Sequence, residues 1–170
     1  MKRIPATVVL LSLAASGLLL AQESPFVGTW KLNVAKSKYS GEQPPRSETR
    51  TVVAQGDGLK VTYKGMAADG SPIAYSFTTN LDGKDSPFLG AHIFGGDNVA
   101  VRRVDANTTT SVVKKAGKTL VTLTTVVSKD GMVTTQTATG TNAQGQPLSF
   151  TTVWDKQPNV MVDPPRWKTP

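Results

Sequence analysis

The chain has 170 residues, with 19 lysines and arginines against 12 acidic residues and a formal net charge of +7. It contains no cysteine, which excludes disulfide bonds, thiol chemistry and cysteine-ligated metal sites. The basic residues are scattered and form no stripe with interleaved aromatics, so we expect no nucleic-acid partner. The length is typical of one domain that is stabilised by its core alone.

The first residues have the pattern of a signal peptide. Lys2 and Arg3 precede an uncharged stretch from Ala6 to Ala21, which is shorter than the roughly 20 residues that a spanning helix needs. An uncleaved anchor is the alternative, because Leu19 stands where a small residue is preferred before a cleavage site. We expect an exported protein, periplasmic or secreted, with no stable membrane insertion after the leader is removed. The predicted divisions are a signal peptide over 1–22, a β domain over 26–156 and a Pro-rich tail over 157–170.

The first strand after the leader begins at Gly28 in the stretch "FVGTWKLN". Trp30 alternates with Leu32, so we expect its ring to face the core and to plug one end of the fold. Gly28 would allow another part of the chain to approach closely. If the first and last strands pair, Trp30 should lie near Phe150, Thr152 or Trp154.

Period-two alternation of apolar and polar residues continues along the chain. It is clearest at 59–64 and 73–77, and both runs predict strands with one covered face. The inward side chains would be Leu59, Val61 and Tyr63 in the first run and Ile73, Tyr75 and Phe77 in the second. Other runs rich in Val and Thr lie at 48–54, 99–104, 108–114, 119–127, 133–139 and 148–154.

Turns rich in Asp, Asn and Gly separate these runs, as they do in hairpins. The sequence therefore predicts an all-β fold, a single up-and-down antiparallel β-barrel of about 8–10 strands, because closure removes exposed sheet edges. A β-sandwich is the alternative. Two segments, 57–79 and 130–152, also share an Asp-Gly start, a turn motif after Gly65 and Gly140, and an S-F-T-T end. We expect both to be hairpins of one design.

The Gly28-x-Trp30 start followed by many short strands resembles lipocalins and fatty-acid-binding proteins, the calycin group. It also resembles small exported bacterial proteins of unassigned function. The calycin resemblance implies a ligand-holding barrel whose Trp closes one end. Two features depart from it: the last strand offers Lys156 where lipocalins place an Arg against that Trp, and 35–46 is too short, with Pro44 and Pro45, for the two helices that cover the pocket of fatty-acid-binding proteins.

Catalytic arrangements are scarce. His92 is the single histidine, and the sequence identifies no acid to orient it beside a nucleophile. The acidic residues lie mostly in turns, so we expect no metal, no cofactor and no catalytic residue. A small barrel-mouth enzyme remains an alternative that requires His92 to face a pocket beside an acid.

A long connection at 82–98 carries Phe88, Leu89, Ile93 and Phe94 between glycines. Loops of this length tend to form binding loops or plugs, and both alternatives stay open here. Arg103 shares a strand face with Val99 and Val101; if that face is inward, its guanidinium would need a carboxylate or phosphate partner. The alternatives are a register slip or bulge that puts Arg103 outside and Arg102 inside, or a strand end at which both lie in water.

The function predicted from these features is binding of a small apolar or amphipathic molecule, in one version with an acidic head, inside the barrel. The candidate ligand-binding residues are Tyr63, Tyr75, Phe77, Phe88, Phe94 and Arg103, and the candidate closure residues are Gly28, Trp30 and Trp154. The alternative is an envelope interaction module with a packed, ligand-free barrel, which would contact a protein partner through the tail at 157–170.

Overall fold

The structure, a computed structural model, describes residues 24–40, 43–142 and 144–158. The predicted signal peptide and most of the Pro-rich tail lie outside these residues. No helix in the described part is long and apolar enough to cross a membrane. The strands are β1 (Gly28–Leu32), β2 (Lys38–Ser40), β3 (Ser47–Gln55), β4 (Gly58–Met66), β5 (Pro72–Thr79), β6 (Asp82–Pro87), β7 (Leu89–Gly90), β8 (Asn98–Arg103), β9 (Thr108–Lys115), β10 (Lys118–Val127), β11 (Val133–Thr141) and β12 (Pro147–Lys156).

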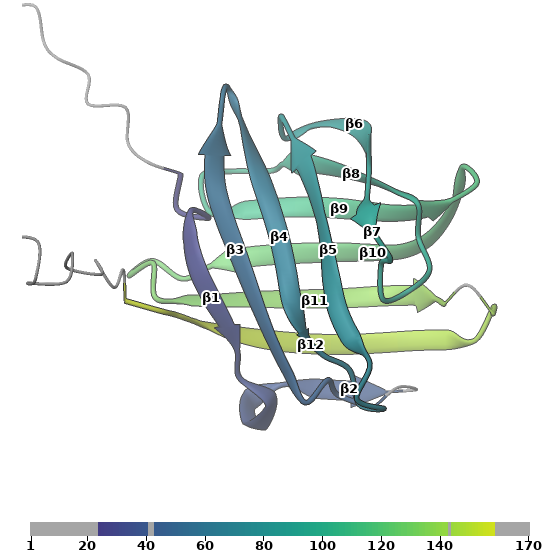
Figure 1. Cartoon of the computed structure of the whole chain (residues 1–170). Coiled ribbons are helices and arrows are strands. Elements are labelled where there is room, and N and C mark those ends of the chain that lie inside the picture. Colours follow the sequence, from purple (N-terminus) through teal and green to yellow (C-terminus); the bar gives the residue numbers. More distant parts are fainter. Residues whose placement is uncertain (1–23, 41–42, 143, 159–170) are drawn as a thin grey trace, which may run out of the picture.

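All these strands belong to one antiparallel sheet, which confirms the predicted all-β barrel rather than the sandwich. Its hydrogen-bonded order is β6-β8-β9-β10-β11-β12-β1-β3-β4-β5-β7, and β2 pairs with β12. In Figure 1 the strands β1, β3, β4 and β5 cross in front of β8 to β12 at a steep angle, so the sheet curls around its own apolar face. The barrel is nearly closed, with its opening between β5 and β7 on one side and β6 and β8 on the other.

The strand count exceeds the expected 8–10 because the structure adds three short strands, β2, β6 and β7. Two of them, β6 and β7, lie inside the segment 82–98, which the sequence predicts as one long connection. The run "DGKDSP" of β6 shows no apolar alternation, since none of its residues is buried. Short, solvent-exposed strands of this kind form by pairing with neighbouring strands, and their local sequence does not predict them.

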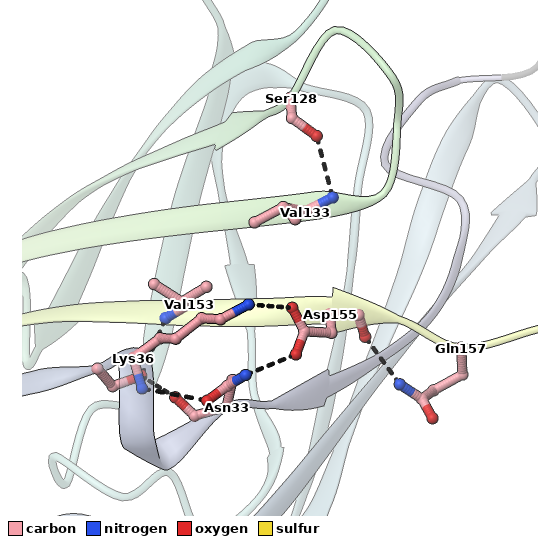
Figure 2. A network of polar contacts seen from close by, with 8 residues as sticks. Asn33, Lys36, Ser128, Val133, Val153, Asp155 and Gln157 are labelled. Carbon is pink, nitrogen blue, oxygen red and sulfur yellow. Dashed lines mark hydrogen bonds and ion pairs between the residues drawn. The ribbon is translucent and has the colours of Figure 1, made fainter.

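The first and last strands do pair, as expected for closure. Trp30 lies opposite Lys156, and Leu32 lies opposite Trp154, in the β1–β12 ladder. The 3₁₀ turn η1 (Val34–Lys36) follows β1 and is fixed to β12 by side chains (Figure 2). Asn33 Nδ2 donates to Asp155 Oδ2 at 2.7 Å, and Val153 N donates to Ser37 Oγ at 3.0 Å.

The two similar segments are hairpins of the same geometry, β4–β5 and β11–β12. Gly65 pairs with Ile73 across its hairpin and with Glu48 on the neighbouring β3. Gly140 likewise pairs with Leu148 and with Val121 on β10. A Cβ at either glycine would lie 2.1 Å from a backbone carbonyl oxygen, that of Ser47 or of Leu120. Each glycine therefore allows a close approach of the third strand, and Glu48 and Val121 occupy equivalent positions.

Replacing Gly65 by Ala should lower the free energy of unfolding by about 2 kcal/mol or more, because the new methyl group meets rigid backbone. Chemical denaturation measures the change. The control is Gly117→Ala, where a Cβ meets nothing within 4 Å and only the positive φ of +78° is unfavourable; its cost should be about 1 kcal/mol. Equal costs for the two substitutions would contradict the close-approach role.

Candidate functional site

One end of the barrel interior is filled by Trp30 and Trp154, which are 0% and 2% exposed. The Arg50 guanidinium carbon lies 5.7 Å from the Trp30 ring centroid and 4.9 Å from that of Trp154. Lys156 Nζ lies 5.2 Å from the Trp30 ring centroid, so the last strand supplies a second cation to this tryptophan. A Cβ at Gly28 would lie 2.8 Å from Lys156 Cε, and the glycine thus leaves room for this side chain.

A cavity of about 80 Å³, here named the outer chamber, lies farther along the barrel axis. On this measure it has room for a few water-sized groups. Aromatic side chains from β2, β4, β5, β12 and the segment 88–94, His92 included, make up half of its lining residues. Its residues are Tyr39, Pro45, Glu48, Tyr63, Tyr75, Phe77, Phe88, His92, Ile93, Phe94, Val99, Ser111, Val113, Leu123, Gln136, Phe150, Thr152 and Trp154.

The aromatic rings of the outer chamber pack against one another. Tyr63 stacks on Tyr75 with centroids 4.7 Å apart, and Phe88 stacks on His92 at 4.2 Å. Phe94 stacks on Phe150 at 5.4 Å. These contacts hold the segment 88–94 over the barrel opening and give the chamber stiff, polarizable walls.

A wider depression of about 350 Å³ lies at the mouth and shares part of the same wall. The shared residues are Tyr39, Pro45, Ile93, Phe94 and Phe150. The depression is bounded on its other side by the β4–β5 turn, through Ala67, Ala68 and Asp69. The depression and the outer chamber therefore adjoin each other at these residues.

A second cavity of about 60 Å³, the inner chamber, is lined by Arg50 and mostly apolar residues. Tyr63, Phe77, Ser111 and Gln136 line both cavities and form the partition between them. The two charged side chains of β3 are separated by this partition: Glu48 lines the outer chamber and Arg50 the inner one.

Glu48 is the exceptional group of the outer chamber. It is 5% exposed, and its Oε1 has no hydrogen-bond partner among the described residues. Ion pairs within 4.0 Å in the described part involve Lys36, Lys84 and Lys114, and none involves Glu48. Burial raises the pKa of Glu48 to about 7, although the positive charge of Arg50 opposes this rise. The carboxyl therefore changes its charge near neutral pH.

The other titratable groups of the chamber keep their neutral forms. Burial, reinforced by Glu48, raises the pKa of Tyr39 to about 12, and burial also raises the pKa values of Tyr63 and Tyr75. Burial lowers the pKa of His92 to about 4. Its Nδ1 accepts a hydrogen bond from the backbone N–H of Phe94 at 3.2 Å.

His92 faces the same chamber as an acid, Glu48, which is the placement that the enzyme alternative requires. Its ring nevertheless stacks on Phe88, and its lowered pKa makes it a weak base. The described residues contain no group of three or more His, Asp or Glu side chains that would hold a metal ion.

Most of the ligand-binding candidates lie together. The outer chamber contains Tyr63, Tyr75, Phe77, Phe88 and Phe94. The inward placement of Arg103 is wrong: this residue is exposed at the last position of β8. The reason is that β8 ends at Arg103: its ladder with β9 runs from Asn98 to Arg103 without a register shift, and the side chain at its last position emerges into water.

Sequence reasoning missed the two charged residues of the interior, Glu48 and Arg50. A signal was available, because both alternate with Val52, which is also buried. The expectation that charged side chains face water hides this alternation.

No family model matches the sequence. No curated protein matches it either. The structure is similar to that of zebrafish ileal bile acid-binding protein complexed with cholic acid, with 18% identity, a TM-score of 0.48, and coverage of 79% of this chain and 100% of that chain. It is also similar to apocrustacyanin C2 (10% identity, TM-score 0.43, 83% of this chain and 66% of that one) and lobster apocrustacyanin A1 (11%, 0.41, 81% and 64%). Matches this distant assign neither a family nor a ligand to this chain.

Glu48 should make the stability depend on pH. Its folded pKa of about 7 exceeds its ordinary value of 4.5, so the folded state holds the proton more tightly than the unfolded state. The Glu48 contribution to stability should fall as pH rises from about 4.5 to about 7 and then stay level, by about 3 kcal/mol in total. Denaturation of the wild type and of Glu48→Gln across this range measures the difference, which should grow in favour of the variant. A constant difference would contradict the raised pKa.

Proposed function

We propose that this protein binds a small apolar or amphipathic molecule inside its barrel. The observation that carries the proposal is the outer chamber: an aromatic cavity that shares its wall with an open mouth and contains a buried carboxyl without a partner at Oε1. Apolar walls with few polar groups are typical of small-molecule sites. A barrel that served only as a packed support would gain stability from an apolar residue at position 48.

The size of the chamber limits the ligand. About 80 Å³ accommodates a compact group, and the remainder of a larger molecule would lie in the mouth between Tyr39, Pro45 and Ile93. The proposed ligand is therefore smaller than a long lipid, or it enters only with one end. Arg103, the expected partner of an acidic ligand head, is exposed and does not line this chamber, so such a head would lack that partner here.

The alternative function is that of a packed interaction module, which would contact a protein partner through the tail at 157–170. Most of that tail lies outside the described residues.

Filling the chamber should abolish ligand binding. Ser111 lines both chambers, whereas its neighbour Thr110 lines neither, so Ser111→Phe should block the site and Thr110→Phe should not. Native mass spectrometry of the protein purified from its own host should show a bound small molecule in the wild type and in Thr110→Phe but not in Ser111→Phe. A titration with benzyl alcohol, monitored by NMR of the chamber side chains, should likewise show binding to the wild type and to Thr110→Phe but not to Ser111→Phe. Absence of binding in the wild type by both measurements would contradict the proposal.

We also propose that the protein works outside the cytoplasm, periplasmic or secreted, on the basis of the leader at 1–22. Expression of the full chain should yield a mature form that begins near residue 22, and N-terminal sequencing and cell fractionation check this. Recovery of the chain with Met1 intact in the cytoplasmic fraction would contradict export.

A further inference from the structure

The charges of the outer chamber are of one sign. Its lining includes one acidic side chain, Glu48, and no lysine or arginine. The nearest cation of the interior, Arg50, lines the inner chamber and lies over the Trp154 ring. His92 is neutral above about pH 5, because burial lowers its pKa to about 4. A carboxylate ligand would therefore meet a like charge and no partner.

The aromatic walls of the chamber favour a positively charged ligand, as the carboxylate of Glu48 does. The faces of aromatic rings carry negative potential and attract ammonium groups, by about 2 kcal/mol where water is excluded. Tyr39, Tyr63, Tyr75 and Phe150 line the chamber together with Glu48, whereas the Trp154 ring already has Arg50 over it. A carboxylate within an aromatic enclosure is the combination that recognises organic cations.

The fold itself does not require a carboxyl at this position. Glu48 and Val121 are equivalent, since each pairs with the close-approach glycine of one of the two similar hairpins. Val121 is 0% exposed and fills its place with an apolar side chain. The hairpin geometry therefore does not account for a carboxyl at position 48.

We infer that the outer chamber binds a small organic amine in its protonated form, with the ammonium group at Glu48 and the apolar body against the aromatic rings. This inference rests on the proposed function and names the chemical class of its ligand.

Three probes of similar size and different charge test the inference: benzylamine, benzyl alcohol and benzoate. At about pH 8, where Glu48 is ionised, the wild type should bind benzylamine at least about tenfold more tightly than benzyl alcohol and should not bind benzoate detectably. Glu48→Gln should remove this preference and leave the affinity for benzyl alcohol within about threefold. Asp57→Asn is the matched control, because Asp57 is exposed in the β3–β4 turn and loses the same charge.

A pH series on the wild type gives a second measurement that needs no variant. The titratable groups that line the chamber with Glu48 are Tyr39, Tyr63, Tyr75 and His92, and between about pH 6 and about pH 8 none of them changes its charge. Arg50, two residues along β3, is the positive charge that acts on Glu48. Benzylamine stays protonated in this range, so its affinity should rise about tenfold with pH as Glu48 ionises, whereas that of benzyl alcohol should stay constant.

The outcomes separate the two proposals. Binding of benzyl alcohol without a preference for benzylamine, or with no dependence on Glu48, overturns the amine inference and leaves the proposed function standing. Tighter binding of benzoate also overturns it and points to Arg50 as the ligand's partner. Failure of all three probes overturns the amine inference, and together with the absence of a bound small molecule in native mass spectrometry it overturns the proposed function as well.

Discussion

Pairing of β1 with β12 on one side and β3 on the other turns a linear series of hairpins into a barrel. The ladder alone is short, because only Trp30, Lys31 and Leu32 of β1 have partners on β12. Side chains supply the rest of the seam: Asn33 and Lys36 bind Asp155 on the outside, while Trp30 and Trp154 pack with Arg50 on the inside. The cavities exist because this seam closes the sheet around them.

The closed sheet places two charged residues of β3 in an interior that is otherwise apolar and aromatic. Arg50 lies over the faces of two tryptophans, although its Nε has no hydrogen-bond partner among the described residues, and Oε1 of Glu48 likewise has none there. An isolated buried carboxylate is unfavourable, and the raised pKa of Glu48 is the expression of that cost. Barrel closure and the candidate site are therefore linked, because β3 carries both Arg50, which packs at the closed end, and Glu48, which lines the outer chamber.

The gap in the sheet lies between its two end strands, β6, which pairs with β8, and β7, which pairs with β5. Phe88 and Phe94 from the intervening segment fill this region by packing on Phe77 and Phe150. Their neighbours Leu89 and Ile93 stay exposed, at 64% and 44%. Residues of the segment 88–94 thus line the chamber and lie at its rim.

The sequence by itself determined the strands whose alternation is strong, such as Tyr63, Tyr75 and Phe77 facing inward, together with the hairpins and the pairing of Trp30's strand with the last one. These follow from side-chain period and turn chemistry, which are local. Only the tertiary structure decided that Arg103 lies in water, that β6 and β7 form, and that Glu48 and Arg50 lie inside. Their placement depends on where the sheet closes and which strands neighbour one another, and the burial of a charge depends on partners far away in the chain.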